Sequence, residues 1–206
     1  MGTRLSTWAA ARLVASLVLA GALAGCGAND HADPLAGVPR NLVLEARPIG
    51  RGASFHPPAT GPVIGPCRSR LGTRVGVHVE LFAANRVVLV AEGIGTRPPR
   101  GFDAGRISSA GCYGQLVTID PTGLVLVRPG TTPTLAQLFR SWGQPLSSSQ
   151  LASFAAAPGT HVSVFVDGDR QPGAPSQVPL ARHSEIVLEV GPYVPPHPSY
   201  TFPPGS

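Results

Sequence analysis

His78 and Glu80 are the residues of this sequence whose types and spacing suit a shared metal ion. They lie two positions apart in residues 74–82, where apolar and polar side chains alternate, so a strand would place both on one face. A closed zinc site needs about four ligands, and most such pairs are solvated strand residues. We therefore expect no metal site and no cofactor, with His78 and Glu80 as weak candidates, and no tight binding of zinc or copper.

Residues 1–25 have the three parts of a secretory signal, namely arginines, an uncharged apolar run and small residues before a cysteine. The apolar run of about 11 residues is too short for a bilayer span, which needs about 20. The end of the segment, Leu23-Ala24-Gly25-Cys26, resembles the bacterial lipobox. The resemblance implies cleavage before Cys26 and a diacylglycerol on its thiol. We expect a signal peptide over 1–25 and a lipid anchor at the outer face of the cell membrane; the alternative is an ordinary secretory signal with a chance cysteine.

Cys67 and Cys112 remain as an even pair once Cys26 carries lipid. Exported proteins fold in an oxidising compartment, where such pairs form disulfides. We expect a Cys67–Cys112 disulfide, with two buried thiols as the alternative.

Composition and motifs bear on the remaining function classes. The chain has no Gly-x-Ser-x-Gly, Ser-x-x-Lys or His-Glu-x-x-His motif and no glycine-rich phosphate loop with lysine, so we expect no enzyme. All 16 basic residues are arginine, and loss of 1–25 lowers the net charge from +5 to +3. This favours an anionic membrane or wall polymer. No nucleic-acid motif is present, so the expected partners are the membrane, through the lipid, and an envelope protein or wall polymer.

Residues 74–82 alternate like a half-buried strand, and we expect them to form a β-hairpin with the continuous apolar run 87–91. A second hairpin is expected from 115–119 and 124–127, joined by the turn Asp120-Pro121-Thr122-Gly123. Residues 92–111, which contain Arg97-Pro98-Pro99-Arg100, are expected to form a long loop.

Residues 134–142 predict one clear helix. Thr134 and Gln137 fit a capping box, and Gly143 supplies the C-terminal stop. Four large apolar side chains share one face of this helix: Leu135, Leu138, Phe139 and Trp142. A weaker helical turn over 147–154 and strands over 161–166 and 185–190 follow.

This order of elements predicts an α+β domain with a mainly antiparallel or mixed sheet and one packed helix, similar to the β-grasp arrangement. We expect the domain to span 67–191. Residues 26–66 form a tether and irregular segment, disordered like the signal and with a short strand at 42–45. Residues 192–206 form an extended, proline-rich tail.

Short motifs between residues 67 and 204 resemble a family of uncharacterised exported actinobacterial proteins. The matching segments are Thr134-Leu135-Ala136-Gln137-Leu138-Phe139, Trp142-Gly143, Val166-Asp167-Gly168, Glu185-Ile186-Val187 and Ser199-Tyr200-Thr201-Phe202-Pro203. The family's His-x-His-x-His-Leu strand corresponds to Gly76-Val77-His78-Val79-Glu80-Leu81, and its Leu-His-Thr-His-Asp segment to Leu116-Val117-Thr118-Ile119-Asp120. Four of the five histidines are therefore replaced here, and the resemblance implies a retained scaffold with a degenerate histidine site.

The sequence favours a lipid-anchored, non-catalytic binding module of the cell envelope. A metal-handling lipoprotein, for zinc or copper, is the alternative. An envelope hydrolase is the least favoured hypothesis.

Overall fold

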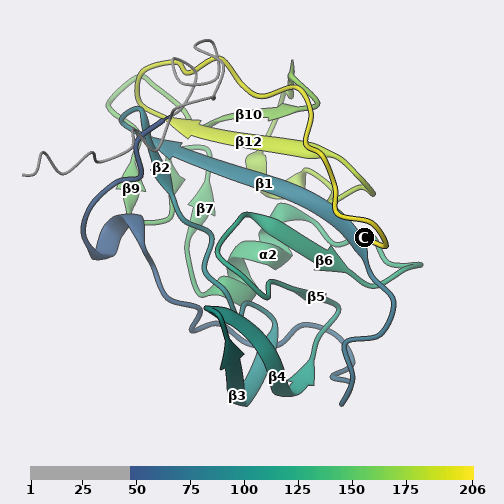
Figure 1. Ribbon diagram of the computed structural model, residues 1–206. Coiled ribbons are helices and arrows are strands. Elements are labelled where there is room, and N and C mark those ends of the chain that lie inside the picture. Colours follow the sequence, from purple (N-terminus) through teal and green to yellow (C-terminus); the bar gives the residue numbers. More distant parts are fainter. Residues whose placement is uncertain (1–46) are drawn as a thin grey trace, which may run out of the picture. The chain divides into compact units, whose positions relative to one another are not determined.

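Strand β1 (Val75–Ala83) lies inside a seven-stranded sheet (Figure 1) in the computed structural model, which describes residues 47–206. All of these residues belong to one unit, Glu45–Ser206. Cys26, the expected signal peptide over 1–25 and the expected strand at 42–45 lie outside the described residues. Within that part of the chain, no helix is long and apolar enough to cross a membrane.

The sheet is mixed, with β1 between a parallel and an antiparallel neighbour. Strand β12 (Glu185–Val190) runs parallel to β1. On the other side, β6 (Leu124–Val127) pairs with the first half of β1, and β2 (Arg86–Val88) pairs with its end. The remaining strands, which extend the sheet outward, are β10 (Ser163–Val166), β11 (Asp169–Arg170) and β5 (Leu116–Val117). A mixed sheet with a single α-helix in the described residues confirms the predicted α+β class.

Helix α2 (Leu135–Trp142) begins and ends where its sequence signals predict. Thr134 and Gln137 form the capping box, and Gly143 adopts the left-handed conformation, with φ 83°, that ends the helix. The four large apolar residues of the helix are buried in one core cluster with Val77, Val79 and Leu81 of β1. The helix therefore covers the face of β1 that carries these aliphatic side chains.

The chain before β1 packs against the domain although it is irregular. Its short 3-10 helix η1 (Ala53–Phe55) is followed by Pro57, whose carbonyl accepts a 2.9 Å hydrogen bond from the indole Nε1 of Trp142. The backbone N of Leu89 also donates to the carbonyl of Phe55. Cys67 and Cys112 form the predicted disulfide, with Cα atoms 5.5 Å apart, which ties this segment to strand β4. Residues 47–66 are thus held to the domain.

Two segments form strands that the sequence analysis did not predict. Instead of a loop over 92–111, β3 (Thr96–Asp103) and β4 (Arg106–Tyr113) form a hairpin that lies apart from the main sheet (Figure 1). Its register shifts between Arg97 and Arg100, around the two prolines, which broke the alternating pattern.

The expected helical turn over 147–154 is also wrong. A three-stranded sheet replaces it, made of β7 (Leu146–Ser147), β8 (Gln150–Leu151) and β9 (Phe154–Ala155). Ala152 has φ 46°, which lies outside the right-handed helical region and marks the turn between β8 and β9. A second 3-10 helix, η2 (Pro175–Gln177), precedes β12.

The second face of β1 is covered by the C-terminal segment, residues 191–206. Tyr200 and Phe202 pack against a small core cluster that includes Leu124 and Leu126 of β6. A Cβ atom on Gly76 would lie 2.8 Å from the ring of Phe202. The prediction of a half-buried β1 is therefore wrong, because its polar face is buried as well.

Candidate functional site

His78, Glu80 and Glu185 bring one ligand atom each to within 4.8 Å of one another. We name these three residues the His78 cluster. Alternation along β1 places His78 and Glu80 on the same face, as predicted. Glu185 joins them because parallel pairing sets it opposite His78 at the start of β12.

The ring of His78 is fixed by both of its nitrogens. Nε2 lies 2.9 Å from the carbonyl oxygen of Thr122, and Nδ1 lies 2.7 Å from Oε2 of Glu185. A carbonyl oxygen only accepts, so Nε2 must carry a hydrogen. Nδ1, the nitrogen that faces Glu185, shares a further proton with the carboxylate of Glu185.

Burial and pairing act in opposite directions on this pair. Burial lowers the pKa of His78, but the hydrogen bond and charge of Glu185, the hydrogen bond to Thr122 and the charge of Glu80 together outweigh burial and raise that pKa above its ordinary value. Burial raises the pKa of Glu185, and the hydrogen bond with His78 offsets only part of that rise. The pair therefore holds its shared proton more tightly than two exposed groups would.

Glu185 has a second, unsatisfied oxygen. The residue is 1% exposed, and its Oε1 has no hydrogen-bond partner among residues 47–206. Most buried carboxylate oxygens in proteins have at least one partner. The unpaired Oε1 is thus a position in the cluster where a water or an ion can bind.

The C-terminal segment closes over the cluster. The ring of Tyr200 stacks on that of His78, with centroids 3.8 Å apart and planes 8° from parallel. Nδ1 of His197 lies 2.7 Å from Oε2 of Glu80. Glu80 and His197 are both partly exposed, so this end of the cluster faces solvent. A cavity of about 80 Å³ adjoins it and is bordered by His78, Glu80 and residues 121–123.

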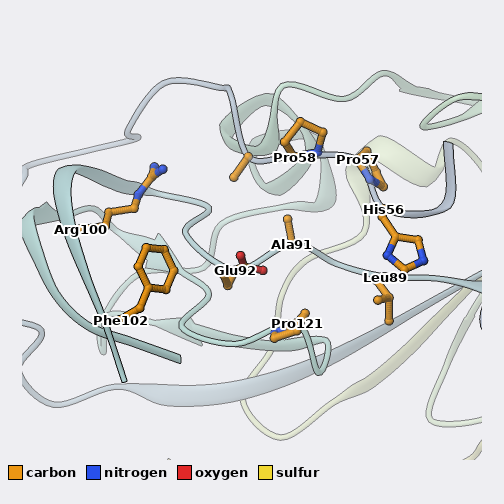
Figure 2. A pocket seen from close by; sticks show the side chains of 10 residues that line it. His56, Pro57, Pro58, Leu89, Ala91, Glu92, Arg100, Phe102 and Pro121 are labelled. Atoms are coloured by element: carbon orange, nitrogen blue, oxygen red, sulfur yellow. The ribbon is translucent and has the colours of Figure 1, made fainter. Parts of the chain in front are cut away.

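A larger pocket of about 440 Å³ lies between the irregular segment before β1 and the β3–β4 hairpin (Figure 2). We name it the proline pocket; its lining residues include His56, Pro57, Pro58, Glu92, Arg100 and Phe102. Phe102 is 58% exposed. Figure 2 shows Arg100 and Phe102 on one side of the pocket, His56 on the other and Glu92 between them.

Arg100 is held in place by oxygens that carry no charge. Its Nε donates to Oγ1 of Thr96 over 2.8 Å, and its Nη2 donates to the carbonyls of Gly93 and Thr96 over 3.1 and 2.9 Å. Within residues 47–206 no carboxylate forms an ion pair with Arg100. The guanidinium charge at the rim of the pocket is therefore positioned but not neutralised.

The sequence identified two of the three cluster residues. His78 and Glu80 meet as expected, whereas Glu185 and His197 were missed. An acid at the start of the apolar run Glu185–Val190 was the available signal for Glu185. Two further histidines that open or precede strands, His161 and His183, do not belong to the cluster. The chain matches no protein-family model, no curated protein and no solved structure.

Proposed function

We propose that the protein is a lipid-anchored module of the cell envelope that binds a wall polymer non-covalently in the proline pocket. The observation that carries the proposal is the pocket itself, where an exposed aromatic ring lies beside one fixed cation and one carboxylate. Ligand sites typically combine a mainly apolar lining with a few placed polar groups. Anchoring through Cys26 would hold the domain next to the wall.

The lining suits the saccharide part of such a polymer. The exposed ring of Phe102 and the exposed apolar ring of Pro58 offer surfaces for the C–H face of a sugar, which the negative face of an aromatic ring attracts. The carboxylate of Glu92 can accept hydrogen bonds from sugar hydroxyls. The charge of Arg100 suits acidic substituents, and the net positive charge expected for the mature chain acts in the same direction.

We propose that no covalent chemistry takes place in this domain. Cys67 and Cys112 are bonded to each other, which removes both thiols of the described residues as nucleophiles. His78 pairs with a carboxylate as a catalytic base does, but its Nε2 donates to the Thr122 carbonyl and does not accept a hydrogen bond from a hydroxyl or thiol. Covalent catalysis needs a nucleophile within hydrogen-bond reach of its base, and no such group is hydrogen-bonded to His78 in the described residues.

Two further proposals concern the fold and the family. We infer a β-grasp arrangement, supported by the pairing of β1 with β6, the helix that follows, and the pairing of β10 with β12, which runs parallel to β1. The resemblance to the exported actinobacterial family also stays a proposal, supported by the motifs quoted above.

Co-sedimentation with purified, insoluble cell-wall polymer tests the function, using the full-length protein in detergent. We expect Phe102→Ala to weaken retention by about tenfold, which corresponds to about 1.4 kcal/mol. Tyr193→Ala is the matched control, because Tyr193 is a comparably exposed aromatic residue, at 68%, that does not line the proline pocket. Equal loss in both variants, or no retention of the wild type, would contradict the proposal.

Metal handling is the second candidate function. The His78 cluster favours metal handling, because the structure adds Glu185 as a third possible ligand to His78 and Glu80.

A further inference from the structure

We infer that the His78 cluster is a binding site for a divalent transition-metal cation, with His78, Glu80 and Glu185 as ligands and His197 as the residue that orients Glu80. This inference rests on the second candidate function and names its ligands. It departs from the expectation of no metal site, which counted only the two residues on β1.

The spacing of the ligand atoms fits one ion. Nitrogen and oxygen ligands lie about 2.0–2.2 Å from zinc, so two of them can be at most about 4.4 Å apart. The three atoms of the cluster already lie within 4.8 Å of one another. The remaining difference of about 0.4 Å is small enough for minor side-chain adjustments to close.

His78 is oriented as metal-ligating histidines are. Such a histidine donates its other ring N–H to a carbonyl or carboxylate, which fixes the tautomer and the ring. Here Nε2 donates to the carbonyl of Thr122, and Nδ1 faces Oε2 of Glu185. A cation between Nδ1 and the carboxylate would take the place of the proton that now joins them.

Glu185 supplies an independent observation. Its buried Oε1 has no partner in residues 47–206 and belongs to the carboxylate that faces His78. The adjoining cavity of about 80 Å³ has room for a cation with one or two waters, since a water occupies about 30 Å³. A bound cation would satisfy the Glu185 carboxylate, and waters in this cavity, which His78 and Glu80 border, would complete the coordination of the ion.

The donor set selects the class of ion. Two carboxylates balance a charge of +2, and the imidazole favours zinc, copper(II), nickel(II) or iron(II) over calcium and magnesium, which prefer oxygen ligands alone. Soft copper(I) prefers thiolate or thioether ligands, which this cluster does not contain. Zinc is the practical probe because it is redox-inert.

The site also involves the C-terminal segment. His197 lies 2.7 Å from Oε2 of Glu80, which leaves Oε1 of Glu80 to coordinate, and Tyr200 covers the His78 ring. Carboxylate ligands that are hydrogen-bonded in this way are held in their binding orientation.

Titration calorimetry with zinc chloride tests the inference, using full-length protein in detergent after chelator treatment and dialysis. We expect one zinc ion per chain, and Glu185→Gln should weaken binding by at least about tenfold. Glu185→Gln retains the shape of the side chain. Glu80→Gln at the exposed end provides a second variant if the first fails to fold, as judged by circular dichroism. His161→Gln is the matched control, because His161 is an exposed histidine outside the cluster and should leave binding unchanged.

Absence of zinc binding in the wild type, or wild-type zinc affinity in both Glu185→Gln and Glu80→Gln, would overturn the inference. Failure here is distinguishable from failure of the polymer proposal. Phe102→Ala should bind zinc normally, and Glu185→Gln should still be retained by the wall polymer.

Discussion

Replacement of Phe139 by alanine tests whether α2 is the main support of the core. Phe139 is 1% exposed, and its ring packs at a tilt against Trp142 with centroids 5.6 Å apart. Deletion of a buried phenylalanine ring costs about 3–5 kcal/mol, because transfer free energy is lost and a cavity remains. Since a domain has about 5–15 kcal/mol of stability in total, we expect Phe139→Ala to remove a large part of it.

Urea unfolding of the protein without residues 1–25 measures this loss. Trp142 is then the only tryptophan, so its fluorescence reports directly on the core. With a urea dependence of about 2 kcal/mol per molar, a loss of about 4 kcal/mol lowers the midpoint by roughly 2 M. Arg140→Ala, at an exposed position of the same helix, should change the stability by less than about 0.5 kcal/mol. A Phe139→Ala midpoint as close to wild type as that of Arg140→Ala would refute the reasoning.

Three further predictions concern the anchor, the disulfide and a second buried acid. Cys26→Ala should yield an unprocessed or released protein without lipid, seen by mass spectrometry, and mature protein that still partitions into detergent would contradict the anchor. Reduction of Cys67–Cys112, which closes a loop of 45 residues, should lower the unfolding free energy by about 4 kcal/mol; an unchanged urea midpoint would count against this. Burial raises the pKa of Glu189, so the folded state loses stability as pH rises through the interval between its unfolded and folded pKa values. Glu189→Gln should therefore raise Tm at pH 7, and the gain should shrink below the ordinary glutamate pKa. A lower Tm for the variant at pH 7 would show that the charge of Glu189 is favourable.

Elements specified by local signals could be predicted from the sequence. The helix is one such element, because Thr134, Gln137 and Gly143 mark its ends. The spacing of its apolar residues also fits a helix with one buried face and does not fit a strand. The alternation around His78 likewise predicted β1. The β3–β4 hairpin could not be predicted in this way, because its prolines and glycines interrupt any two-residue period.

Half of the candidate site depends on tertiary structure. Glu185 reaches His78 only through parallel pairing between strands that are 107 residues apart at this contact, and no local pattern encodes that register. The burial of His78 depends on Tyr200, whose segment looked like a free tail because its prolines exclude regular structure. The proline pocket was missed because it forms between two segments that were both expected to be loops.

The parallel pairing of β1 with β12 also sets the order in which the domain can fold. The chain emerges N-terminus first, during synthesis and during the export proposed above, so β1 exists long before its neighbour, which is 107 residues further on at the His78–Glu185 contact. Non-local strand pairs of this kind form slowly, in milliseconds to seconds for sheet-rich domains. Until β12 arrives, β1 exposes an unpaired strand edge that invites wrong partners. The domain therefore closes only when nearly all of its residues have emerged, and a nascent chain interrupted before residue 185 has no route to the native sheet.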